Sequence, residues 1–162
     1  MKRYWILAAA VGAFLAVQIV WAGMHEKTPP PDGEKLWSYI TEENPYLQWE
    51  PFPGYEGMYE GKSPHGAFLK LYANDIAVKA ADQGMPLPDG AILVKENYAE
   101  DRKTLAAVTP MYKVKGYNPA AGDWFWAKYG PEGKVMAEGK VEGCIKCHSV
   151  KEDQDYIFSQ PR

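Results

Sequence analysis

The sequence predicts a small, turn-rich, largely β protein of the mainly β (α+β) class, and three observations support this. The chain has 162 residues, 46% of them hydrophobic, which is enough for one domain with its own core. Aromatic residues make up 14% of the chain, and aromatic side chains favour strands. The 15 glycines and 13 prolines interrupt almost every stretch after residue 29, so long helices are not expected there.

The first 22 residues have the pattern of a signal peptide. Lys2 and Arg3 precede an apolar run over residues 5–20, and segment 20–22 places small residues where a signal peptidase requires them. We therefore expect cleavage after Ala22 and a periplasmic or otherwise extracytoplasmic protein. The alternative is an uncleaved membrane anchor, because the apolar run is only slightly shorter than the roughly 17–25 residues of a transmembrane helix.

The charge of the chain argues against nucleic acid as a partner. The formal net charge is −3, and removal of residues 1–22 leaves 16 basic against 21 acidic side chains, a net charge of −5. A nucleic-acid-binding domain normally carries the opposite sign.

The mature chain begins with a proline-rich linker over residues 23–32 and continues as one domain over residues 33–162. Asp32 is placed to cap a short helix over residues 33–41, in which three apolar side chains share one face: Leu36, Tyr39 and Ile40. Residues 44–64 contain six Pro or Gly residues before the closing Pro64, so their aromatic side chains must pack from irregular loops. Long ordered loops often serve a functional site.

Five strands are predicted after these loops, at residues 67–73, 91–98, 107–115, 124–129 and 134–141. Asn74 is placed to cap a helix that runs to about Gln83 and ends at Gly84. The last two strands form a hairpin, in which Trp124, Trp126 and Lys128 lie on one face and the alternate residues on the other.

The chemistry of the chain is concentrated at Cys144, Cys147 and His148. Two thiols three positions apart, followed at once by an imidazole, form the attachment pattern of haem c. The spacing lets both sulfurs reach the vinyl groups along one haem edge from a single tight turn, while His148 gives a ring nitrogen to the iron. We therefore predict one covalently bound haem.

Three other interpretations of these residues are weaker. A zinc site needs four ligands, whereas His25 and His65 stand alone in the sequence. A thioredoxin-like dithiol belongs near the start of a βαβ unit, and this pair follows a hairpin near the C-terminus. A structural disulfide gives His148 no role.

A β-rich chain with a late haem motif resembles the cytochrome P-460 family, which includes the β-type cytochromes c-prime. The resemblance covers roughly residues 33–158 and is carried by six segments: 64–66, 70–74, 94–98, 111–117, 122–126 and 143–148. It implies a twisted antiparallel sheet, a homodimer, and a five-coordinate iron with His148 as its proximal ligand. Some members oxidise hydroxylamine with a haem cross-linked to a lysine, whereas the β-type cytochromes c-prime bind nitric oxide without that link. Lys70 and Lys79 are the candidate cross-linking lysines by location alone.

Several residues are candidates for the face of the iron opposite His148. His65 is a candidate second ligand, although a lone histidine in a turn more often bonds to backbone, and Glu96 is a candidate distal acid or base if it points inward. The remaining candidates are thioether ligands and aromatic caps, all of which are more often core residues: Met58, Met85, Met111, Met136, Phe52, Phe68 and Trp126.

The sequence leaves two function classes open. A five-coordinate haem would bind or transform a small nitrogen species such as nitric oxide or hydroxylamine, whereas a six-coordinate haem would only transfer electrons. The resemblance favours the first, and a haem-free extracytoplasmic dithiol oxidoreductase is a distant third. Residues 113–151 hold seven lysines against four acidic side chains, so this end of the chain could steer an acidic redox partner protein toward the haem edge.

Overall fold

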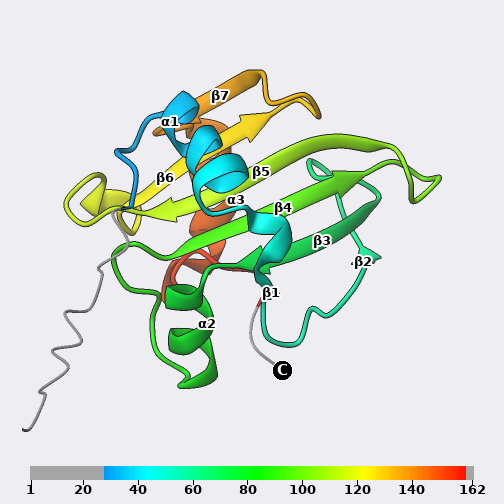
Figure 1. Ribbon diagram of the computed structural model, residues 1–162. Helices are drawn as coiled ribbons and strands as arrows, with labels where there is room; N and C mark the ends of the chain where they lie inside the picture. Colours follow the sequence, from blue (N-terminus) through cyan, green and yellow to red (C-terminus); the bar gives the residue numbers. More distant parts are fainter. Residues whose placement is uncertain (1–27, 160–162) are drawn as a thin grey trace, which may run out of the picture.

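A seven-stranded antiparallel sheet forms the centre of the molecule in the computed structural model, which describes residues 28–159 (Figure 1). The predicted signal peptide and the first half of the predicted linker, residues 23–27, lie outside the described residues. None of the described helices is both long and apolar enough to cross a membrane. The predicted mainly β (α+β) class is confirmed.

The sheet has the order β1-β3-β4-β5-β6-β7, and β2 also pairs with β3. Each predicted strand corresponds to one of the strands β3 to β7, with ends that differ by at most two residues. The bounds are β1 Glu50–Pro51, β2 Tyr59–Glu60, β3 Phe68–Ala73, β4 Ile92–Tyr98, β5 Leu105–Lys113, β6 Trp124–Tyr129 and β7 Val135–Gly139.

The helices begin where the sequence predicts. Helix α1 (Gly33–Ser38) is capped by Asp32, whose side chain accepts a hydrogen bond from the Lys35 backbone N–H, and it continues as a π-helical turn, η1 (Tyr39–Glu43). Helix α2 (Asp75–Asp82) is capped in the same way by Asn74. The remaining helical segments are α3 Glu142–His148 and the 3₁₀ turns η2 Tyr46–Gln48, η3 Pro119–Ala121 and η4 Ser149–Gln154.

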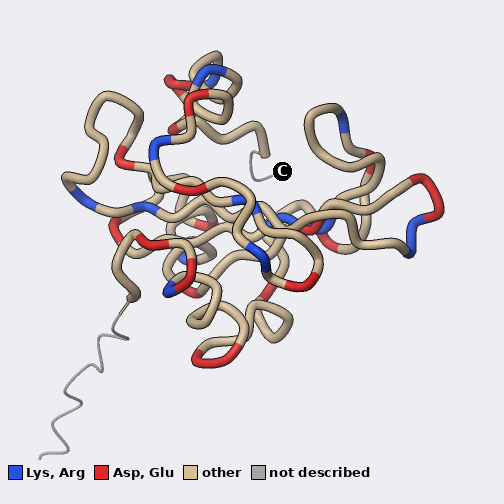
Figure 2. Tube along the Cα trace, turned by 90° about the horizontal axis from the view of Figure 1, so that it is seen from above, with Lys and Arg blue, Asp and Glu red and all other residues tan. Residues whose placement is uncertain are grey.

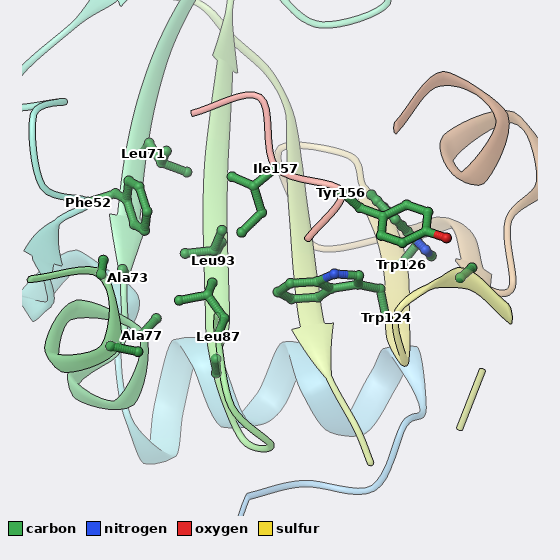
Figure 3. Close-up of a cluster of buried hydrophobic side chains, with 14 residues drawn as sticks. Phe52, Leu71, Ala73, Ala77, Leu87, Leu93, Trp124, Trp126, Tyr156 and Ile157 are labelled. Carbon is green, nitrogen blue, oxygen red and sulfur yellow. The ribbon is translucent and has the colours of Figure 1, made fainter. Parts of the chain in front are cut away.

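The sheet separates two hydrophobic clusters. One face packs against α1 and η1 through Leu36, Ile40 and the β4 residues Ile92 and Val94. The other face packs against α2 and the C-terminal segment, where Leu93 contacts the cluster that includes Phe52, Trp126 and Ile157 (Figure 3). In Figure 1, α1 lies in front of the sheet and α3 behind it. The molecule is therefore a sheet covered on both faces, with the cysteine-bearing helix on the face opposite α1.

Strand β6 shows the alternation that the sequence predicts. Trp124 and Trp126 belong to the cluster on the α3 side, whereas Phe125, Ala127 and Tyr129 belong to the cluster on the α1 side. Strands β6 and β7 form the predicted hairpin, with Trp126 opposite Gly139. This hairpin leads directly into α3 and so positions the two cysteines over the sheet.

Candidate functional site

A cavity of about 570 Å³ lies between the sheet and α3. Alternate residues of three adjacent strands line it, because the side chains of a strand point to one face at every second position. The sheet residues at its wall include Leu93, Lys95, Asn97, Ala107, Thr109, Met111, Trp126 and Lys128, and helix α3 and the C-terminal segment complete it with Cys144, Cys147, His148, Ile157 and Phe158. The cysteines and the histidine of the haem motif thus lie at this cavity.

Helix α3 presents both thiols and the imidazole to this cavity. Cys144, Cys147 and His148 stand at positions i, i+3 and i+4 of the helix, which share one helical face. Both thiols are free, with Cys144 half-buried and Cys147 exposed, and burial raises the pKa of Cys144. The single tight turn expected from the motif is instead a helix of seven residues.

His148 lines the cavity, and one of its ring nitrogens is held by a hydrogen bond. Its Nδ1 lies 2.7 Å from the backbone carbonyl oxygen of Tyr156, and since a carbonyl only accepts, Nδ1 must be the donor. Nε2 is therefore the nitrogen with a free lone pair, as in metal-bound histidines whose other nitrogen donates to a carbonyl. Burial lowers the pKa of His148, which keeps the ring neutral and able to ligate.

The carbonyl that holds His148 is positioned by an unusual backbone turn. Asp155 and Tyr156 have φ values of 55° and 63°, in a region that residues with a side chain rarely adopt. Asp155 is fixed by an ion pair with Lys113 and accepts a hydrogen bond from the Leu87 backbone N–H. The C-terminal segment therefore folds back over α3, and the contacts of Asp155 stabilise this conformation.

His65 lies beside His148 at the same cavity, in the loop before β3. Its Nδ1 is 3.0 Å from Oδ1 of Asn97, and its ring centroid is 6.3 Å from that of His148. Burial is the main cause that lowers the pKa of His65, to about 4. Gly66 is required beside it, because a Cβ there would lie 2.5 Å from the Tyr98 carbonyl oxygen. The structure therefore brings this sequence candidate to the site.

Glu96 lies on the other face of the sheet, away from the cavity. It is 4% exposed and accepts hydrogen bonds from the hydroxyl groups of Tyr46, Tyr72 and Tyr98, at 3.0, 3.4 and 2.7 Å. Its neighbours Lys95 and Asn97 point to the cavity, so strand alternation directs Glu96 away from it. The expectation that Glu96 faces the iron as an acid or base is therefore corrected.

Three of the other distal candidates line the cavity, and the remaining ones lie elsewhere. Met111, Met136 and Trp126 line the cavity. Phe52 is a buried core residue, and the Phe68 ring lies 4.2 Å from the guanidinium carbon of Arg102. Met58 and Met85 do not line the cavity, and Met85 is 53% exposed.

The lysines at the cavity are not those that the sequence suggested. Lys70 extends over the Tyr98 ring on the Glu96 face, and Lys79 is exposed on α2. Lys95 and Lys128 line the cavity instead, and burial lowers the pKa of Lys95 to about 8. The signal available in the sequence was the alternation of β4, which places residue 95 on the same face as residues 93 and 97.

The residues at this cavity fit a haem. Among residues 28–159 no group of three or more His, Cys, Asp or Glu side chains is placed to hold a metal ion. The cavity wall is largely apolar, as expected for a macrocycle. The buried indole N–H of Trp126 has no acceptor within the described chain, and a bound group with carboxylates could supply one.

Comparison with known proteins agrees with this geometry. The model of the cytochrome P460 family matches residues 46–159, which include the whole sheet and all cavity residues named above. No curated protein matches the chain.

Proposed function

Because the chain belongs to the cytochrome P460 family and is therefore a haem-binding cytochrome, we propose that it carries one haem c on Cys144 and Cys147, with His148 as axial ligand. The observation that carries this proposal is the placement of both thiols and the unprotonated His148 nitrogen on one face of α3, at one cavity. Thioether bonds to an exported protein would keep the haem from being lost outside the cytoplasm.

In this proposal the haem iron supplies the redox chemistry and binds the small ligand. The chain orients and shields the group. Tyr156 fixes the His148 tautomer, while Trp126 and Phe158 pack on the imidazole, with ring centroids 4.6 and 5.1 Å away. These contacts restrict rotation of the ring and so hold its nitrogen in one direction.

Mass spectrometry under denaturing conditions tests the attachment. Protein from cells that mature haem c should retain one haem on the peptide that contains residues 144–148, and Cys144→Ser with Cys147→Ser should lose it. His148→Ala should keep the thioethers but change the spectrum of the iron. A haem-free chain with a disulfide would contradict the proposal and favour a dithiol oxidoreductase.

We further propose that the iron is five-coordinate and binds or transforms a small nitrogen species, nitric oxide or hydroxylamine. The ferrous protein should then bind carbon monoxide without first losing a side-chain ligand. His65→Ala and Met111→Ala should leave the resting spectrum nearly unchanged. A low-spin resting spectrum that becomes high-spin in either variant would support the alternative, a six-coordinate electron-transfer cytochrome.

The presence or absence of a covalent bond between a lysine and the haem would distinguish hydroxylamine oxidation from nitric oxide binding. We expect hydroxylamine oxidation only if such a bond is present, and the position of the cavity now favours Lys95 or Lys128 over Lys70 or Lys79. Peptide mapping of the haem-bearing fragment would identify the linked residue. Without the link, nitric oxide binding or electron transfer is the proposed role.

Export, the partner protein and assembly are proposals on sequence grounds. The mature N-terminus should be Gly23, which N-terminal sequencing of the periplasmic protein would test, and full-length protein recovered only from membranes would indicate an anchor. A redox partner protein and a homodimer complete the proposal.

A further inference from the structure

Asp155 connects the C-terminal segment to the body of the domain. Its carboxylate forms an ion pair with Lys113 at the end of β5, and it accepts a hydrogen bond at 3.2 Å from the backbone N–H of Leu87, in the loop after α2. The side chains of the ion pair are only 13% and 19% exposed, so water screens their attraction weakly. The indole N–H of Trp124 donates to the Asp155 backbone carbonyl at 2.9 Å, and the Lys113 ammonium lies 4.5 Å from the Trp124 ring centroid. Asp155 is therefore held by β5, by β6 and by the loop after α2.

These contacts compensate for an unfavourable backbone conformation. Asp155 and Tyr156 are consecutive, and both have the left-handed φ values that residues with a side chain rarely adopt. Such a pair persists only where contacts with the rest of the structure hold it. Tyr156 adds two contacts of its own. Its hydroxyl donates to the Ala120 carbonyl at 3.3 Å, and its ring packs so closely on Gly122 that a Cβ there would lie 2.8 Å from a ring carbon.

This turn aims the backbone carbonyl of Tyr156 at His148, whose Nδ1–H donates to it at 2.7 Å. A hydrogen bond at Nδ1 makes the other ring nitrogen a more basic ligand, and a more basic axial nitrogen stabilises ferric iron relative to ferrous iron. The position of this carbonyl therefore affects the reduction potential of an iron bound to His148. Neither Lys113 nor Asp155 lines the cavity, so both act on His148 only through the turn.

We infer that Lys113 and Asp155 are positioning residues for the axial ligand. Their ion pair holds the turn at residues 155–156, so that the Tyr156 carbonyl meets His148 Nδ1, and it thereby lowers the reduction potential of the haem iron. This inference rests on the proposed ligation of the iron by His148 and does not depend on whether the opposite face is open.

Reduction potentials of holoprotein variants test the inference. Asp155→Asn removes the negative charge but keeps an oxygen for the Leu87 N–H and a residue type that tolerates a positive φ. Lys113→Met removes the positive charge and keeps most of the side-chain length. Each variant should weaken the hydrogen bond of His148 and shift the equilibrium toward ferrous iron by up to about tenfold, the effect of one hydrogen bond. For a one-electron couple this shift is a rise of up to about 59 mV.

The two variants distinguish positioning from a direct effect of charge on the iron. Through space, loss of a negative charge raises the potential and loss of a positive charge lowers it. Positioning instead predicts a rise in both variants. The double variant should shift the potential no further than the larger single variant, because both changes break the same ion pair. Lys113→Arg keeps the charge and should remain close to the wild type.

Resonance Raman spectroscopy of the ferrous five-coordinate protein gives a second measurement. The stretching frequency of the bond between the iron and His148 should fall in Asp155→Asn and in Lys113→Met, because the ring becomes a less basic ligand. Lys115→Met, which removes an exposed lysine of the same segment, is the matched control and should leave this frequency unchanged.

Two results would overturn the positioning role while the haem attachment stands. One is a shift of the two potentials in opposite directions with an unchanged Raman frequency. The other is a lower urea midpoint in both variants with neither the potential nor the frequency changed, which would mean that the ion pair only stabilises the fold. If His148→Ala kept the same iron–histidine band, His148 would not be the ligand, and both the proposed ligation and this role would be wrong.

Discussion

His65 and His148 are oriented by the same kind of contact. Each ring donates through Nδ1 to an oxygen that cannot donate in return, the Asn97 side chain in one case and the Tyr156 backbone in the other. Both neutral rings therefore have an unprotonated Nε2.

Glu96 is expected to stabilise the fold without affecting the cavity. In Glu96→Gln one acceptor oxygen is lost, and the three tyrosine hydroxyls must share the other or accept from the new NH₂ group. We expect the free energy of unfolding to fall by about 1–2 kcal/mol in urea denaturation. The affinities for nitric oxide and hydroxylamine should not change.

Tyr72→Phe is the control for this variant, because its 3.4 Å contact is the longest of the three and its loss should cost less. If Glu96→Gln altered the affinity for either ligand, the carboxylate would act on the cavity side after all, and the assignment of Glu96 to the opposite face would be wrong.

At the scale of elements, the strands could be predicted because their signals are local. The aromatic alternation of residues 124–129 gives the bounds of β6 and both of its faces. Helix α1 is followed by a π-helical turn that no residue of 39–43 signals on its own, since Tyr39 and Ile40 fit an α-helix equally well. The short strands β1 and β2 exist only through pairing with β3, which a local pattern cannot reveal.

The site could be predicted only where the motif is contiguous. Cys144, Cys147 and His148 were found because they are adjacent in sequence. Lys95 was missed and Glu96 was a distal candidate, because β4 is buried on both faces. Strand alternation places residues 95 and 96 on different faces but does not indicate which of them faces the cavity. The bonds of Asn97 to the loop before β3 and to β5 depend on strand register, which the sequence does not determine.

Asn74 is expected to stabilise the junction of β3, α2 and β4. Its Oδ1 accepts from the backbone N–H groups of Ala77 and Ile92, and its Nδ2 donates to the Gly90 carbonyl. Asn74→Ala removes the helix cap and leaves buried backbone groups unpaired, so we expect a loss of about 2–3 kcal/mol in urea unfolding. Asn74→Asp keeps the acceptors and should lose less. Equal losses would show that the Gly90 bond dominates.

The whole molecule uses one sheet to separate a reactive face from a packing face. The thiols, both histidines and Lys95 lie on the α3 side, while Glu96 and its three tyrosines lie on the side of α1 and η2. Acidic and basic residues are distributed over the whole described trace in Figure 2.

Attraction of a redox partner would therefore depend on the lysines nearest α3. Replacement of one of them, Lys146→Glu, should slow electron exchange with an acidic partner at low salt.

Two tyrosines whose pKa values are raised predict how the stability of the molecule responds to alkali. Burial raises the pKa of Tyr72 to about 12, and burial likewise raises the pKa of Tyr59 to about 12, against about 10 in the unfolded chain. Between these values the folded state retains phenolic protons that the unfolded state has released, so stability falls as pH rises. The pKa of Lys95 is lowered to about 8, so between pH 8 and about 10.5 the unfolded chain holds a proton that the folded chain has lost, and this residue makes stability rise with pH. The effect of the tyrosines on stability is therefore clearest above that range.

Urea midpoints of the holoprotein, measured from neutral pH to about pH 12, should therefore decline most steeply above about pH 10.5. Tyr72→Phe removes one group whose pKa is raised in the folded state, so the urea midpoint of this variant should decline less steeply above about pH 10.5. At neutral pH its midpoint should be slightly lower than that of the wild type, because the contact with Glu96 is lost. The comparison of slopes separates titration from the loss of the Glu96 contact, which shifts the whole curve without changing its shape. Parallel curves for the two proteins would mean that Tyr72 ionises alike in the folded and unfolded states.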